Sequence, residues 1–90
     1  MATYLVTYDL NNEVKRPPIV EKVKSFPGYA MLSESSYAIS TPLTVQQVYE
    51  TFKPLLDDDD TIYIISLRKP WTGFGPKDVN QWLADNLPNS

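Results

Sequence analysis

The side chains able to do chemistry in this chain are carboxylates, hydroxyls and a few basic groups. Its 90 residues include no Cys and no His. Disulfides, thiolate zinc sites, cysteine nucleophiles and the imidazole that most often acts as a general base are therefore excluded. Any catalysis has to use Asp, Glu, Ser, Thr, Lys or Arg, and a bound metal ion is the partner that best activates such groups.

The densest group of carboxylates is the run Asp57-Asp58-Asp59-Asp60. A Ca²⁺ loop of the EF-hand type alternates its ligands and needs a Gly and a distal Glu, which this run lacks. We therefore interpret it as a solvated turn. Residues 71–76 contain two glycines but lack the Walker spacing and the Lys-Ser/Thr of a phosphate loop. We interpret them as a loop anchored by Trp71 and Phe74, with a lid or partner contact as the alternative.

The basic pair Lys15-Arg16 is either a phosphate ligand or an ordinary surface pair. Lys and Arg number 8 against 11 Asp and Glu, for a net charge of −3. Because nucleic-acid binders normally carry a basic excess, this balance argues against a general one and leaves room for a small basic face only. Tyr4 and Tyr8 have rings of the kind that stack on bases in open-sheet proteins. We interpret them instead as residues of the core or of a dimer interface.

Two segments have the β-branched and aromatic composition of strands covered on both faces. They are residues 3–8, followed by a polar turn that starts at Asp9, and residues 61–67. Residues 29–40 predict a hairpin that turns near Glu34-Ser35, with Ser keeping one side polar.

Helices are predicted at three places between and after these strands. Pro17-Pro18 favours a helix start and Pro27-Gly28 ends that helix. Thr44 and Gln47 have the spacing of a capping box that opens a second helix. Residues 77–87 predict a short last helix. The side chains expected to face the core are Ile19, Val23 and Phe26; Val45, Val48, Tyr49, Phe52 and Leu56; and Val79, Trp82, Leu83 and Leu87.

This order predicts an α+β fold, the ferredoxin-like split βαβ (β-α-β-β-α-β) with a short C-terminal helix, as one domain over residues 1–90. Right-handed crossovers put the first two helices on one face of a four-stranded antiparallel sheet. Since the outer segments 3–8 and 61–67 are apolar on both sides, the second face should also be covered. We expect a second copy in a homodimer, or the C-terminal segment, to cover it.

No apolar stretch reaches the roughly 18 residues of a membrane helix, so we expect no membrane association. The opening Met1-Ala2-Thr3-Tyr4 lacks a basic segment followed by an apolar run. We therefore expect no signal peptide and a cytoplasmic location.

Three segments resemble the CRISPR-associated Cas-two proteins and, more closely, the SinR-like proteins grouped beside them. The first is Tyr4-Leu5-Val6-Thr7-Tyr8-Asp9-Leu10, an apolar strand that ends in Tyr-Asp. Residues 32–39 are similar to the middle hairpin of that family. Residues 60–67 are similar to its acidic turn followed by a strand.

The resemblance implies a homodimer in which Asp9 pairs with its copy and holds Mg²⁺ for phosphodiester cleavage. Asp9 is then both the catalytic residue and the metal ligand, and carboxylate oxygens suit Mg²⁺. The alternative for Asp9 is structural, since an Asp at the end of a strand often caps the next turn by accepting from nearby amides. Lys15, Arg16, Ser33 and Ser35 are the expected contacts to nucleic-acid phosphates. Other members of the family act without catalysis, as a dimeric bridge that holds DNA.

A different class of function remains open beside this one. The excess of acidic residues and the lack of His and Cys also fit a non-catalytic dimeric module whose acidic surface meets a protein partner. A metal-dependent nuclease and an interaction module are the two hypotheses that the sequence leaves.

Overall fold

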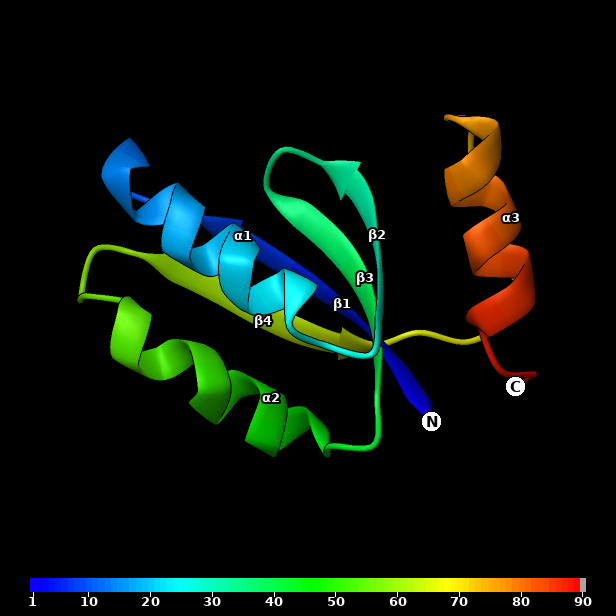
Figure 1. The fold of residues 1–90 in the computed structure, drawn as a ribbon, viewed down its shortest axis with the longest axis horizontal. Coiled ribbons are helices and arrows are strands. Elements are labelled where there is room, and N and C mark those ends of the chain that lie inside the picture. The colour runs from blue at the N-terminus through cyan, green and yellow to red at the C-terminus, as the bar shows by residue number, and fades with distance from the viewer. Residues whose placement is uncertain (90) are drawn as a thin grey trace.

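The computed structural model describes residues 1–89 as a four-stranded antiparallel sheet with three α-helices (Figure 1). The predicted α+β class is confirmed, and the arrangement is consistent with a ferredoxin-like fold. The elements are β1 (Ala2–Asp9), α1 (Arg16–Lys24), β2 (Gly28–Ser33), β3 (Ser36–Thr41), α2 (Val45–Phe52), β4 (Thr61–Ser66) and α3 (Lys77–Asn86). Single-turn 3-10 helices lie at Glu13–Lys15 (η1) and Lys53–Leu55 (η2).

The strands lie in the order β2-β3-β1-β4, and every neighbouring pair is antiparallel. β1 is therefore central, as its composition predicts. β4 is an edge strand, and the prediction that both of its faces are covered is wrong. Tyr63 is 62% exposed and Ile65 is 50% exposed, because one side of β4 meets solvent.

Both α1 and α2 cover the same face of the sheet and build the core there (Figure 1). Tyr4 and Tyr8 point into this core, and their hydroxyls donate to the backbone oxygens of Leu43 (2.8 Å) and Glu34 (3.0 Å). Their interpretation as core residues is confirmed, and stacking on bases is excluded in this arrangement. The other buried members are Val6, Ile19, Val23, Phe26, Tyr37, Ile39, Val48 and Phe52.

The start of α2 follows the predicted capping box. The Thr44 hydroxyl accepts from the Gln47 amide at 3.2 Å, and the Gln47 side chain accepts from the Thr44 amide at 2.9 Å. Val48 and Phe52 are buried as expected. The prediction for Val45 is wrong, since this side chain is 40% exposed. Val45 is the first residue of the helix and lies at the end of its packed face.

The C-terminal segment folds back over the second face of the sheet, one of the two predicted ways of covering it. Gly28 faces the Trp82 ring of α3, and the Thr3 hydroxyl donates to the Asn86 oxygen at 2.9 Å. Thr3 lies on the opposite side of β1 from Tyr4, because side chains alternate along a strand. Leu87 closes this contact and is 5% exposed.

Part of the second face stays uncovered, over β1 and β4. We call the side chains of Leu5, Thr7, Tyr63 and Ile65, which share this face by strand register, the open strip. Phe74 is also wholly exposed, so its predicted role as a loop anchor is wrong. Residues 67–76 form no helix or strand, and Phe74 lies in this exposed loop. Among residues 1–89, every helix falls short of the length and hydrophobicity that a membrane span requires.

Candidate functional site

The predicted site residues gather at one end of the sheet. β1 runs antiparallel to both neighbours, so its last residues lie opposite the beginnings of β3 and β4. Thr7 pairs with Ser36, and Asp9 pairs with Thr61. The β2–β3 turn, η1 and the loop 57–60 meet at this end, which we call the Asp9 end. It brings together Asp9, Lys15, Arg16, Ser33 and Ser35 from three separate parts of the chain.

Asp9 is exposed and lies on the same side of β1 as Leu5 and Thr7 of the open strip. Within the described residues, its carboxylate makes no side-chain hydrogen bond or ion pair. The turn after β1 is held by other groups, because Asn12 accepts from the Val14 amide (3.1 Å) and Asp60 accepts from the Asn11 amide (2.9 Å). The alternative role of Asp9 as a turn cap is therefore filled elsewhere, and its carboxylate is available for a ligand.

Lys15 is bound to the acidic run rather than free for phosphate. Its ammonium pairs with Asp57 and, at 2.8 Å, with Asp60, and it also donates to the Asn11 side chain at 2.9 Å. These carboxylates raise the pKa of Lys15, Asp57 most strongly. Lys15 thereby fastens η1 to the loop that leads into β4.

Asp60 differs from the rest of the run in being enclosed. Its side chain has no exposed surface, while Asp57, Asp58 and Asp59 are exposed. The Lys15 ammonium, then the Asn11 and Asp57 amides, lower the pKa of Asp60 to about 2. The interpretation as a solvated turn thus holds for three of the four residues, whereas Asp60 is a structural anchor.

Arg16 is likewise engaged within the chain. Its guanidinium donates to the Glu13 carboxylate at 2.8 Å and to the Glu34 backbone oxygen, and it lies 5.7 Å from the centre of the Tyr8 ring. The carboxylate of Glu13 raises the pKa of Arg16, and Arg16 in turn lowers the pKa of Glu13. Arg16 therefore connects the start of α1 to the β2–β3 turn.

The two serines lie in the turn that the sequence predicts. The Ser33 and Ser36 hydroxyls are 2.6 Å apart, and the Ser35 amide donates to the Ser33 hydroxyl at 3.3 Å. The Ser35 oxygen accepts from the Tyr8 amide at 2.9 Å. Ser33 is exposed and Ser35 is half-buried, and the Ser33 hydroxyl is bonded within the turn.

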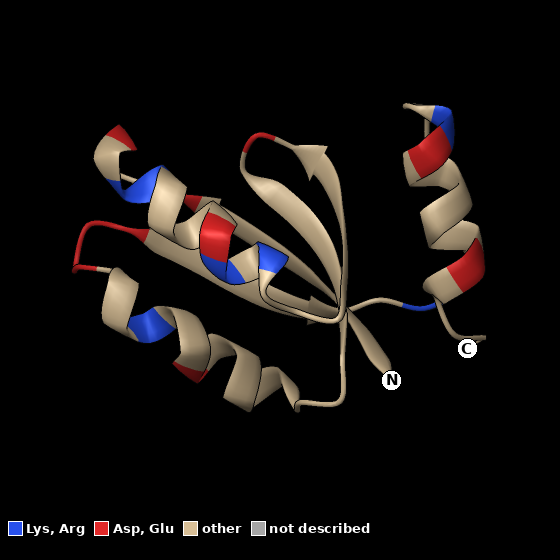
Figure 2. Ribbon diagram, in the orientation of Figure 1, with Lys and Arg blue, Asp and Glu red and all other residues tan. Residues whose placement is uncertain are grey.

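Carboxylates outnumber cations at the Asp9 end (Figure 2). Two bases, Lys15 and Arg16, lie among Asp9, Glu13, Glu34 and the run 57–60. Within residues 1–89, no three carboxylates converge to hold a metal ion. One chain therefore offers Asp9 as a single carboxylate ligand, and a Mg²⁺ site of the implied kind requires the same residue from a second copy.

Charge thus sets a condition on any nucleic-acid contact at this end. A phosphate would have to separate Lys15 or Arg16 from its carboxylate partner, or approach the turn hydroxyls. The residues that the sequence did not single out are Asn12, which caps the turn after β1, and Glu13, which pairs with Arg16. Asp60 was named as part of a solvated turn, and its pairing with Lys15 was not expected. None of the protein-family models matches the chain. Membership of the Cas-two and SinR-like group therefore stays a prediction.

Proposed function

We propose that this protein works as a homodimer that associates with nucleic acid, and that paired Asp9 residues serve metal-dependent cleavage of a phosphodiester. The observation that supports this best is the Asp9 carboxylate, which is exposed, has no bonded partner in the described chain and borders the open strip. The resemblance to Cas-two and SinR-like proteins supplies the reaction class.

The dimer in this proposal forms through the open strip. Tyr63 and Ile65 are large apolar side chains left exposed side by side with Leu5 and Thr7. A two-fold contact covers the same patch on both copies, so each of these residues is buried once in each copy. Asp9 projects from the same side of β1, so this pairing carries both Asp9 residues toward the contact between copies.

The chemistry assigned to each residue follows from its surroundings. Asp9 from each copy supplies hard carboxylate oxygens, the donor that Mg²⁺ prefers. Bound there, Mg²⁺ would activate water and stabilise charge on the phosphate. Ser33 is exposed and offers its hydroxyl to the nucleic acid in exchange for its bond to Ser36. Lys15 and Arg16 contribute only when a phosphate replaces their present carboxylate partners.

A second candidate is a non-catalytic dimeric module that meets a protein partner through the Asp9 end. The excess of carboxylates there and the occupied bases Lys15 and Arg16 favour it. Acidic surfaces repel polyanions and attract basic proteins. The two candidates share the dimer and differ in what Asp9 does.

The deciding experiment is cleavage of labelled single-stranded RNA and duplex DNA with Mg²⁺ or Mn²⁺. We expect Asp9→Asn to lower cleavage by about 100-fold or more, because a metal ion contributes several kcal/mol to the transition state. Asp59→Asn is the matched control, since Asp59 is an exposed carboxylate of the same end with no side-chain partner in the described chain. Equal cleavage by both variants means contamination. No cleavage by folded, dimeric wild type rejects the nuclease and favours the interaction module.

A further inference from the structure

The outer edge of β4 has unpaired backbone groups. The Leu67 amide donates to the Thr3 oxygen at 2.9 Å. With the register of β1 and β4, this bond shows which residues of β4 form backbone hydrogen bonds with β1. In an antiparallel pair, every second residue directs its N–H and C=O toward the neighbour and the others direct theirs away. Tyr63 and Ile65 therefore bond to β1, while Ile62, Ile64 and Ser66 direct their backbone groups outward. No strand in residues 1–89 pairs with this edge.

This edge also lacks the usual devices that prevent pairing. Natural edge strands are protected by charged side chains, by Pro or by a β-bulge. Thr61–Ser66 contains no charged residue and no Pro, and its register with β1 is unbroken. An unprotected edge of β-branched and aromatic residues is a template for one more strand.

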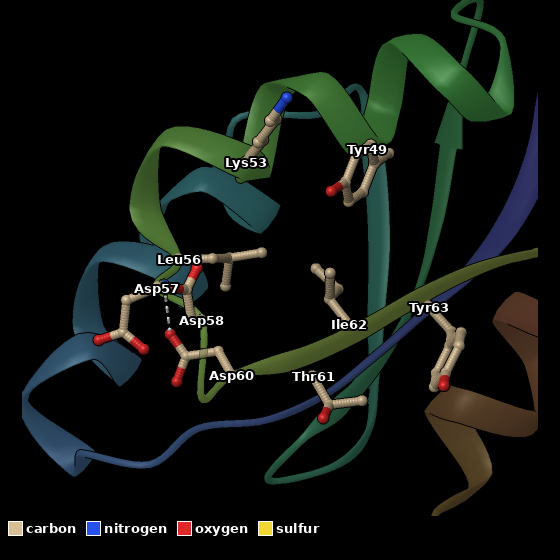
Figure 3. Close-up of a pocket in the computed structure, with 9 residues that line it drawn as sticks. All are labelled: Tyr49, Lys53, Leu56, Asp57, Asp58, Asp60, Thr61, Ile62 and Tyr63. Atoms are coloured by element: carbon tan, nitrogen blue, oxygen red, sulfur yellow. Dashed lines mark hydrogen bonds between the residues drawn. The ribbon is translucent and has the colours of Figure 1, made fainter.

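A groove runs beside the edge, between α2 and β4 (Figure 3). Its volume is about 430 Å³. Tyr63 of the open strip borders the groove, and the apolar lining on the helix-covered side comes from Tyr49, Leu56 and Ile62. A strand laid along β4 directs every second side chain toward the helix-covered face of the sheet. One such side chain would therefore enter this groove and contact those three residues.

The end of the groove next to the start of β4 is acidic. Lys15 pairs with both Asp57 and Asp60 and offsets one of their two negative charges, and Asp58 is the exposed carboxylate of the lining without an ion-pair partner in the described chain. Lys53 also lines the groove but points outward from its helical turn, away from the carboxylates (Figure 3). Charge complementarity at this end therefore calls for a cation.

We propose that the β4 edge binds an extended segment of a basic partner protein, which adds a strand to the sheet. An apolar side chain of the segment fills the groove, and a Lys or Arg pairs with Asp58. Antiparallel pairing is the commoner arrangement, and it puts that basic residue in the C-terminal part of the segment. The site uses the edge of β4, whereas the proposed function uses Asp9 and the open face of the sheet, and Tyr63 is the one open-strip residue that also borders the groove. The two proposals can therefore be tested separately.

The test uses a fluorescent peptide of about eight residues, the length of a typical strand, with alternating Thr and Val and two Lys at its C-terminal end. We expect fluorescence anisotropy to show binding by the whole protein, and a version ending in two Glu to bind at least about fivefold more weakly. N-methylation of every second peptide amide removes the donors of one strand edge. We expect one of the two alternating methylation patterns to abolish binding and the other to preserve it, because only one edge faces β4.

Two protein variants complete the test. We expect Asp58→Asn to weaken binding of the Lys-ended peptide by about twofold to fivefold, the range of an exposed ion pair. Asp59→Asn, one residue along and outside the groove, should leave it unchanged. Equal binding of both peptides, or equal tolerance of both methylation patterns, overturns the proposal. So does loss of a dimer, seen by light scattering, in folded Ser66→Pro, because the edge would then belong to a second copy.

Discussion

The two faces of the sheet are covered to different degrees, although the same four strands build both. On the face under α1 and α2, Val6, Ile19, Val23, Val48 and Phe52 have no exposed surface. On the other face α3 covers β2 and β3, and the open strip over β1 and β4 remains in solvent. The chain covers the first face with its own helices, whereas on the second face it covers only the half formed by β2 and β3.

That difference separates residues that maintain the fold from residues available to a partner. The fully buried side chains of the first face have no surface left to contact a partner, so substitutions of these residues should act on stability. The open strip and Asp9 contribute little to the fold of one copy and should act on association or activity. Substitutions on the two faces test this division, because they should change different measurements.

The largest effect is expected under α2. Phe52→Ala removes a fully buried ring that packs 6.0 Å from the ring of Phe26, and it should lower the free energy of unfolding by about 3–5 kcal/mol. Trp82→Ala, on the half-buried contact of α3, should cost about half as much. Urea unfolding followed by circular dichroism measures both. Equal losses would show that α3 holds the second face as firmly as α2 holds the first.

An effect of intermediate size is expected at the anchor between η1 and β4. The pKa of Asp60 is lowered from its ordinary value of 3.8 to about 2, so the unfolded chain binds a proton more readily than the folded one. Its stabilising contribution should be complete above about pH 4 and should disappear as the pH falls through about 2. Unfolding measured from pH 7 to pH 2 should show that Asp60→Asn is less stable than wild type at neutral pH and approaches it in acid.

Asp59→Asn is the control for that profile, since its exposed carboxylate has no ion pair in the described chain. A constant difference between Asp60→Asn and wild type at every pH would mean that the Asn side chain fails to make the hydrogen bonds of Asp60. The charge of Asp60 would then have no part in stability.

The sequence predicts elements better than it predicts their neighbours. The composition of residues 3–8 correctly predicted a central strand, and Tyr4 and Tyr8 lie in the core because β1 is paired on both edges and covered by helices on one face. Full cover on its other face was also expected, and Leu5 and Thr7 show that this part of the prediction is wrong. The same composition in residues 61–67 gave the wrong burial for Tyr63 and Ile65. A strand that is apolar on both sides can be covered within its own chain or can be exposed until it contacts a partner. The amino-acid sequence of one chain does not distinguish these two cases.

At the Asp9 end, the residues were predicted but their bonds were not. Lys15 and Asp60 are separated by 45 positions, and neither the basic pair nor the acidic run carries a local signal for the other. Their pairing depends on β4 lying next to β1, which only the folded sheet establishes. Phe74 shows the converse, since its hydrophobic character predicted an anchor and its ring is fully exposed.

The smallest effect on stability, with the largest on association, is expected in the open strip. Tyr63→Ser should change the unfolding free energy of one copy by less than about 0.5 kcal/mol, as for most surface substitutions. It should weaken a dimer by about 100-fold, because the substitution removes one ring from each of the two copies in a two-fold contact.

Met31→Ser is the matched control. Met31 is 48% exposed, and it pairs with Tyr37 on the side of the sheet opposite the open strip. Light scattering over a concentration series measures the dissociation constant. Equal weakening by both variants would show that the dimer contact lies outside the open strip. A wild-type protein that is monomeric at micromolar concentration would reject the dimer itself.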